Sequence, residues 1–368
     1  MNRSHSITAL LVILAIAVTA LLVARSLSRQ AGLSENDQPA TSLVAAGDAN
    51  SADSWYSVYF TNPGGIETRT FRGGPDASLA EAIRQARLSV DLAVYELDLW
   101  SIRDALKAAH RNGVVVRAVT DSDHIQQPEI QALVEAGIPV LGDQRESLMH
   151  DKFVVIDRLE VWTGSMNLTL SGAYENDNNL IRIRSPELAE NYLAEFEEMF
   201  TEGRFGSESP PNTPHPVVSI DGTRIETYFS PEDGTAERLV ALIRGAEQSV
   251  NFLAYSFTSD EIAAALLERA QAGVAVAGVL DESQARANTG TEFENLRAQG
   301  LDVYLDGNPE NMHHKVILID EKVVVTGSYN FSASAEERND ENTLILYNPQ
   351  IAGLYLAEFE AVLAEAQR

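Results

Sequence analysis

His150-Asp-Lys152-Phe-Val-Val-Ile-Asp157 returns later in the chain as His313-His-Lys315-Val-Ile-Leu-Ile-Asp320. Each stretch holds a histidine, a lysine two positions on, four apolar residues and an aspartate, and the two histidines are 313 − 150 = 163 residues apart. A second short pattern follows each stretch, as Gly164-Ser165-Met-Asn167 and then as Gly327-Ser328-Tyr-Asn330. Agreement over both patterns indicates that the chain contains an internal repeat.

The repeat extends upstream of these patterns. Residues 89–95 correspond to residues 249–255 at an offset of 249 − 89 = 160, and residues 113–121 match residues 273–281 at the same offset. In both copies, short β-branched apolar runs alternate with segments of helical period, which predicts β-α-β units. We therefore expect an α/β fold built from two sandwich domains that are related by a pseudo-twofold axis.

A proline-rich stretch divides the two copies. Residues 207–216 read Ser-Glu-Ser-Pro-Pro-Asn-Thr-Pro-His-Pro, and proline both fixes φ and removes a backbone donor, which favours a linker. The expected domains are residues 54–206 and 217–368. Since both motifs lie in one chain, we expect the folded body to be a monomer.

The N-terminus carries an uncharged apolar run at residues 7–24, bounded by Arg25 and Arg29. Its helical length of roughly 27 Å would suffice to cross a bilayer, and the run is longer than the apolar region of most signal peptides. We expect residues 1–29 to be a signal anchor, with a cleaved signal peptide as the alternative, and residues 30–53 to be a flexible tether. The resemblance to a signal anchor predicts a single-pass protein of the cell membrane with its folded body outside the cytoplasm, or a secreted protein if the segment is cleaved.

Composition narrows the function classes. The chain has 45% hydrophobic and 22% charged residues, as expected of a globular protein, and it lacks cysteine, which excludes disulfides and thiolate chemistry. A formal charge of −27 disfavours a nucleic-acid partner over most of the surface, although a local basic groove remains compatible with it.

The two motifs resemble the signature of the phospholipase D superfamily, H-x-K-x4-D followed by G-S-x-N. The resemblance covers residues 55–368 and includes the segments 229–231 and 254–258. It implies one active site shared by both halves, a covalent phosphohistidine intermediate, and hydrolysis of a phospholipid headgroup ester to phosphatidic acid and an alcohol. Three other functions stay open: a metal-independent nuclease, a phosphatidyltransferase of the cardiolipin-synthase kind, and a catalytically inactive binding module.

Strand geometry assigns faces to the motif residues. Alternate side chains of a strand share a face, so His313 and Lys315 point together while His314 points away, as a structural or solvent-facing residue. Asp157 and Asp320 lie on the opposite face from the lysines and are expected to be structural.

The remaining motif residues suit a phosphate diester. Their imidazole, ammonium, hydroxyl and amide groups would form a pocket rich in hydrogen-bond donors, in which the two lysines supply positive charge. We find no metal-binding motif and expect neither a metal nor another cofactor. The expected catalytic and phosphate-binding residues are His150, Lys152, Ser165, Asn167, His313, Lys315, Ser328 and Asn330.

The residues 28 positions after the histidines differ between the copies. They are Asn178 (150 + 28) and Glu341 (313 + 28), at a position where the family that this chain resembles often has a carboxylate bonded to the motif histidine. A carboxylate favours the protonated imidazole. We therefore predict that Glu341 holds His313 as the general acid and that His150 is the nucleophile, while Asn178 is structural. Asp177 could take the place of Asn178 after a small backbone shift.

Overall fold

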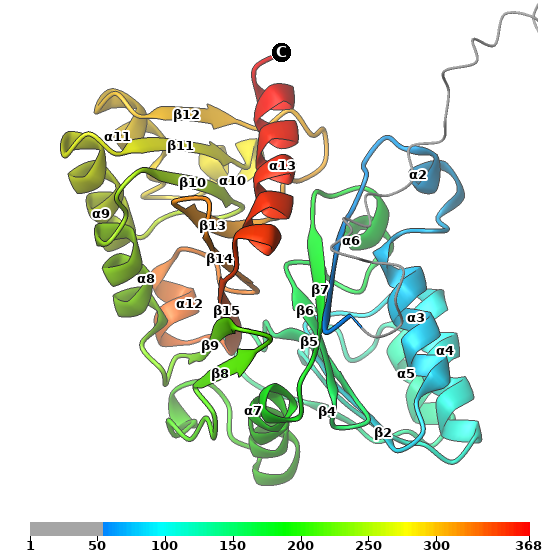
Figure 1. Ribbon diagram of the computed structural model, residues 1–368. Helices are drawn as coiled ribbons and strands as arrows, with labels where there is room; N and C mark the ends of the chain where they lie inside the picture. Colours follow the sequence, from blue (N-terminus) through cyan, green and yellow to red (C-terminus); the bar gives the residue numbers. More distant parts are fainter. Residues whose placement is uncertain (1–53) are drawn as a thin grey trace, which may run out of the picture. The chain divides into compact units, whose positions relative to one another are not determined.

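Two mixed β-sheets, one from each repeat, form the framework of the computed structural model, which describes residues 54–368 (Figure 1). The strand orders are β1-β7-β6-β5-β2-β3-β4 in the first sheet and β12-β11-β10-β13-β14-β15-β9-β8 in the second. The strands of the first sheet are β1 (Tyr56–Phe60), β2 (Ser89–Val94), β3 (Val115–Thr120), β4 (Val140–Gly142), β5 (Lys152–Ile156), β6 (Glu160–Gly164) and β7 (Asn179–Arg184). Those of the second are β8 (Val217–Ile220), β9 (Thr223–Ser230), β10 (Ser249–Ala254), β11 (Ala275–Leu280), β12 (Asp302–Leu305), β13 (Lys315–Ile319), β14 (Val323–Gly327) and β15 (Glu341–Tyr347).

The two sheets repeat one topology. Strands β2, β3 and β4 are parallel, as are β10, β11 and β12, and the motif strands β5 and β13 run antiparallel to β2 and β10. Every residue of β5 and of β13 is buried. Burial on both faces explains why these strands read as continuous apolar runs and do not alternate with polar residues.

Helices cover the outer faces of the sheets and fill the space between them. In Figure 1, α3, α4 and α5 flank the first sheet, α8 and α9 flank the second, and α7 and α13 lie between the two. The helices are α2 (Ile66–Thr70), α3 (Pro75–Gln85), α4 (Trp100–Arg111), α5 (Pro128–Glu135), α6 (Leu170–Tyr174), α7 (Pro186–Glu197), the π-helix η1 (Glu198–Glu202), the 3-10 helix η2 (Gly206–Glu208), α8 (Thr235–Arg244), α9 (Asp260–Gln271), α10 (Glu282–Ala287), α11 (Phe293–Ala298), α12 (Ala333–Glu337) and α13 (Pro349–Ala366).

The halves share one hydrophobic core. Tyr192 of α7 packs edge-on against Phe153 of the first sheet and against Phe229 of the second, with ring centroids 5.0 and 5.2 Å apart. Tyr355 and Phe359 of α13 belong to the same buried cluster. Large aromatic side chains contribute much of the burial energy of a core, so this cluster fixes the two sheets to each other. The mixed α/β fold with two repeated halves is as the sequence predicts.

The segment between the halves is tied to α7. Asn191 of α7 donates to the carbonyl oxygen of His215 at 2.7 Å and accepts from its amide at 2.7 Å, and β8 then begins at Val217. The expected anchor at residues 1–29 and the expected tether at residues 30–53 lie outside the described residues. Within residues 54–368, no helix combines the length and the apolar character needed to cross a bilayer.

Candidate active site

Both motif histidines open into one cleft between the halves, which we call the histidine cleft. Its volume is about 600 Å³. The histidines stand just before β5 and β13, and the pairing of β5 with β2 and of β13 with β10 places each next to the end of a buried strand. The cleft is lined by Tyr95, Glu96, Leu148, His150, Asn167, Ser171, Asn176, Tyr255, Ser256, Thr258, Gln284, Asn288, Thr289, Asn311, His313, Asn330, Ser332, Ser334 and Asn339.

Each histidine is held by a residue of the opposite half. His150 Nδ1 lies 2.8 Å from Glu341 Oε2, whereas His313 Nδ1 lies 2.9 Å from Asn178 Oδ1. The predicted pairing of Glu341 with His313 is therefore wrong. The physical reason is a pair of isolated parallel bridges, Met149 with Asp340 and Asp177 with Met312, which place the residue before each motif histidine against the opposite half.

The contacts of His313 fix its tautomer. Its Nδ1 faces Asn178 Oδ1 and also the carbonyl oxygen of Ser165, at 3.1 Å, and a carbonyl oxygen can only accept. Nδ1 therefore carries the hydrogen. Lys315 Nζ lies 3.2 Å from Nε2, which can accept from the ammonium when the ring is neutral. His313 is thus arranged as a neutral imidazole whose Nε2 holds a lone pair.

His150 sits in a different electrostatic setting. Burial, reinforced by the ammonium groups of Lys152 and Lys315, lowers the pKa of His150, and burial raises the pKa of Glu341 to about 7. The same factors lower the pKa of His313. An anion that enters the cleft would offset the lysines, and the histidine beside the carboxylate would then be the better stabilised cation.

The two lysines lie beneath the cleft. Lys152 Nζ donates to the carbonyl oxygen of His150 at 2.8 Å, and Lys315 Nζ donates to that of His313 at 2.9 Å. Burial lowers the pKa of Lys152 to about 8, against the opposing effect of neighbouring carboxylates, and burial together with Lys152 lowers that of Lys315. Positive charge held in such a dry site attracts an anion more strongly than it would in water.

Two tyrosines were missed by the sequence interpretation. The Tyr95 ring lies edge-on to His150 and the Tyr255 ring edge-on to His313, with centroid distances of 5.2 and 4.4 Å. Lys152 Nζ and Lys315 Nζ lie 5.4 and 4.7 Å from the centroids of the same rings. Both tyrosines end matching strand segments at the 160-residue offset, which is the signal that could have identified them.

The motif serines are not in the cleft, contrary to their expected role as phosphate ligands. Ser165 and Ser328 have no exposed surface. Ser165 Oγ donates to Asn178 Oδ1 at 2.9 Å, and Ser328 Oγ donates to Glu341 Oε2 at 2.6 Å. Their hydroxyl groups are therefore used to position the two residues that orient the histidines.

The motif asparagines do line the cleft. Asn167 Nδ2 donates to Glu96 Oε1 at 2.9 Å. The Oδ1 atoms of Asn167 and of Asn330 are buried and have no hydrogen-bond partner among residues 54–368. A buried amide without its partners carries a free-energy cost, which a substrate with polar groups would relieve.

The motif aspartates and His314 lie away from the cleft, as predicted, although both aspartates stand in turns that follow β5 and β13 and not in the strands themselves. The Asp157 carboxylate accepts from the amides of residues 87–89, and the Asp320 carboxylate accepts from those of residues 247–249. His314 is fully buried between Asn179 and Glu358. Asp177 is bonded by Asn308 Nδ2 at 2.9 Å and does not replace Asn178.

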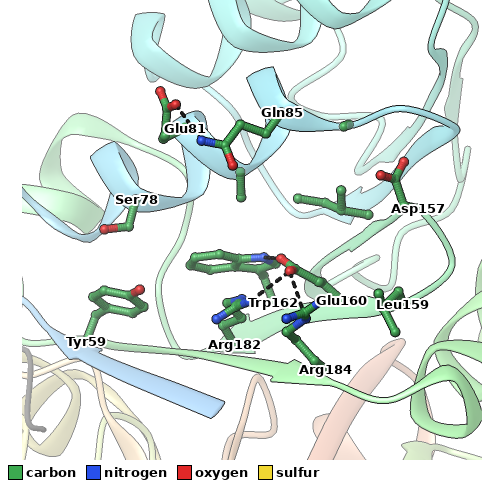
Figure 2. Close-up of a pocket in the computed structure, with 13 residues that line it drawn as sticks. Tyr59, Ser78, Glu81, Gln85, Asp157, Leu159, Glu160, Trp162, Arg182 and Arg184 are labelled. Atoms are coloured by element: carbon green, nitrogen blue, oxygen red, sulfur yellow. Dashed lines mark hydrogen bonds and ion pairs between the residues drawn. The ribbon is translucent and has the colours of Figure 1, made fainter. Parts of the chain in front are cut away.

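Asp157 borders a separate hollow of about 330 Å³ beside α3 (Figure 2). Figure 2 shows its floor, where Glu160 is bonded by Trp162 and paired with Arg182 and Arg184. The arginines are thus neutralised within the hollow. The phosphate-binding groups of the two motifs all lie elsewhere.

Comparisons with known proteins agree with this geometry. Residues 79–200 and 239–363, together more than half of the chain, match the family described as "Cardiolipin synthase, PLD-like domain". A phospholipase D of Rickettsia bellii is 32% identical over 160 residues, which cover 43% of this chain and 79% of the relative. The human mitochondrial cardiolipin hydrolase is 33% identical over 159 residues, covering 41% of this chain and 63% of the relative. The crystal structure of phosphatidylserine synthase from Haemophilus influenzae superposes with a TM-score of 0.62 at 14% identity, over 84% of this chain and 86% of that one, which is a likeness of fold.

Proposed function

Because the chain belongs to the phospholipase D-like family and is an enzyme of the phosphodiesterase type, we propose that it hydrolyses a phospholipid headgroup ester to phosphatidic acid and a free alcohol. One observation carries the proposal: the histidines of two His-x-Lys pairs, 163 residues apart, open into a single cleft, and their lysines lie beneath it. The names of relatives that act on phospholipids support the substrate class.

His313 is the nucleophile in the proposed reaction. Its neutral Nε2 attacks the phosphorus, so that a P–N bond forms and the P–O bond to the headgroup alcohol breaks. His150, protonated and stabilised by the Glu341 carboxylate, gives its proton to the leaving oxygen. This assignment reverses the roles predicted from the sequence, because the carboxylate proves to be bonded to His150.

The second step reuses the same groups. His150 is now a neutral base and takes a proton from water, whose oxygen attacks the phosphorus as the P–N bond breaks. The products are phosphatidic acid and the original neutral His313. The ammonium groups of Lys152 and Lys315 and the amides of Asn167 and Asn330 stabilise the charge on the non-bridging oxygens through both transition states.

The N-terminal segment completes the proposal. An anchor at residues 7–24 would hold the catalytic body beside a bilayer, and its resemblance to a signal anchor supports a site outside the cytoplasm. Cleavage of this segment would instead release the enzyme in soluble form.

A substrate panel tests the proposed function. The full chain in mixed micelles is incubated with phosphatidylcholine, phosphatidylethanolamine, cardiolipin and single-stranded DNA, and the products are separated by chromatography. We expect release of phosphatidic acid or its cardiolipin equivalent by the wild type, loss of at least 10³-fold in the His313→Ala variant, and unchanged rates in the His110→Ala control. Cleavage of DNA alone would establish the nuclease alternative, and transfer of the phosphatidyl group to added alcohol without hydrolysis would establish the transferase.

A further inference from the structure

Two buried carboxylates and a partly buried one, drawn from both halves, lie close together, and none of the three lines the histidine cleft. Glu195 comes from the end of α7, Glu198 opens the π-helix η1, and Glu232 lies between β9 and α8. One oxygen atom of each lies within 4.8 Å of the others. We call these three residues the carboxylate cluster.

The cluster lacks the hydrogen bonds that buried carboxylates need. Glu195 and Glu198 are 3% and 2% exposed. Asn212 Nδ2 donates to Glu198 Oε2 at 2.8 Å, but Glu198 Oε1 and Glu232 Oε2 have no hydrogen-bond partner among residues 54–368, and no hydrogen bond to the Glu195 carboxylate occurs within that range. Buried ionised groups are stable only when they are paired, hydrogen-bonded or bound to a metal.

The surroundings of the cluster add negative charge. The groups that act on Glu195 are Glu232, Asp151, Glu198 and Asp340, and all four are acidic. Arg204 acts on Glu198 but is paired with Glu202 at 3.0 Å, and Arg145 is paired with Asp340. Burial raises the pKa of Glu232 to about 8, as expected for a carboxyl group without a counter-charge. The described residues thus supply three converging anionic ligands, and the arginine that acts on them already has another acidic partner.

A neutral oxygen completes the donor set. Ser209 is 8% exposed, and its hydroxyl lies close enough to Glu198 to lower the pKa of that carboxyl group, although its Oγ makes no well-aligned hydrogen bond among the described residues. Together with the Glu198 Oε1 atom, it is an unsatisfied buried group at the same point. Oxygen donors of this kind, dominated by carboxylates, are what hard divalent cations prefer.

We propose that the carboxylate cluster binds one hard divalent cation of the Ca²⁺ class. Ca²⁺ tolerates irregular oxygen sites, whereas Mg²⁺ demands near-octahedral geometry, so Ca²⁺ fits ligands drawn from three separate segments better. Glu195 and Glu198 belong to the first half and Glu232 to the second. The cation therefore joins the halves and stabilises the assembled body, and it takes no part in the phosphodiester chemistry.

Calorimetric titration of the metal-free full chain in detergent with CaCl₂, at physiological ionic strength, tests the site. We expect about one Ca²⁺ bound per chain, a rise in Tm of about 3 °C at saturation, and weaker effects with MgCl₂. Glu195→Gln and Glu232→Gln should each weaken binding at least tenfold, whatever they do to the stability of the metal-free protein. Glu237→Gln, which changes an exposed carboxylate of α8, is the matched control and should leave binding unchanged.

Two results would overturn the cation site. The first is a wild type that shows neither binding heat nor a Tm shift with Ca²⁺, while its Tm rises as the pH is lowered towards 6, since protons alone would then neutralise the cluster. The second is full retention of Ca²⁺ binding in both glutamine variants. Binding is measured without substrate, so either result leaves the proposed hydrolase activity untouched.

Discussion

His150 Nδ1 lies 2.8 Å from Glu341 Oε2, and these two residues are 191 positions apart in the chain. The matching contact, from His313 to Asn178, has an amide where this one has a carboxylate. A carboxylate stabilises an imidazolium, whereas an amide oxygen orients the ring and leaves it uncharged. The site is therefore symmetric in its backbone and asymmetric in its proton affinity.

Trapping of the covalent intermediate tests which histidine attacks. With a nitrophenyl phosphodiester, whose leaving group needs no acid, the His150→Ala variant should form the intermediate on His313 and then fail to release it. We expect a burst of nitrophenol close to one equivalent per chain, and mass spectrometry should locate the phosphoryl group on residue 313. The His313→Ala variant should show no burst. A phosphoryl group on residue 150 would restore the roles predicted from the sequence.

The pH profile tests the contact of Glu341 with His150. A general acid must be protonated, so activity falls as the pH rises through its pKa, and loss of a neighbouring carboxylate lowers that pKa. We expect Glu341→Gln to move the alkaline limb of kcat, which reports the substrate complex, down by about one pH unit and to reduce kcat about 10²-fold. The control is Glu358→Gln, which alters the carboxylate beside His314 outside the cleft. An alkaline limb that does not move in Glu341→Gln would show that Glu341 does not set the pKa of the general acid.

The motif aspartates should matter for stability. Burial raises the pKa of Asp320, but the hydrogen bonds from the amides of residues 247–249 outweigh this effect and hold the pKa below its usual value. We expect Asp320→Asn to lower the free energy of unfolding by about 1–2 kcal/mol at pH 7, since asparagine keeps the shape and tolerates the positive φ of 52°.

The lowered pKa of Asp320 fixes how its contribution to the free energy of unfolding changes with pH. A carboxyl group whose pKa is depressed on folding contributes stability above its unfolded pKa, and this contribution is lost as the pH falls through the folded pKa. The difference between wild type and Asp320→Asn in urea unfolding should therefore begin to shrink as the pH falls to about 4 and vanish only below the folded pKa, which is lower still. Glu247→Gln keeps the donating backbone amide and serves as the control. An equal loss in that variant would show that the carboxylate of Asp320 is not responsible.

Removal of divalent cations with EDTA should lower the Tm of the protein without changing its catalytic rate. The proposed reaction uses only His, Lys and Asn side chains, so initial rates at 25 °C should be the same with EDTA and with CaCl₂. The Tm should nevertheless fall with EDTA, because the proposed cation joins the two halves, and none of its three carboxylate ligands lines the histidine cleft. A rate that disappears with EDTA in protein shown to be folded by circular dichroism, and that returns with metal, would contradict the reaction as written.

The sequence predicts the elements well because they depend on local patterns. The apolar runs after His150 and His313 are strands β5 and β13, and helices lie between the strands of each copy, as the alternation of the two kinds of segment predicts. His314 points away from His313, as strand alternation predicts, whereas Asp320 lies one residue beyond β13 in a turn with φ of 52° and faces away from the cleft for that reason.

Contacts between the halves could not be predicted in the same way. The position of Glu341, 28 residues after His313, fits an interaction within its own copy just as well, and only the tertiary arrangement brings it to His150. Ser165 and Ser328 were expected in the pocket because spacing does not report which layer of side chains a residue joins. The carboxylate cluster was invisible for the same reason, as Glu232 is distant in sequence from Glu195.

Because each motif histidine is oriented by a residue of the other copy, the two copies of the repeat must evolve together. A substitution of Glu341 alters the surroundings of His150 in the first copy, and a substitution of Asn178 alters those of His313 in the second. Neither copy can therefore drift, specialise or be lost independently after duplication. Selection acts on the pair as one inheritable unit, and compensating changes for a substitution in one copy should be sought in the other.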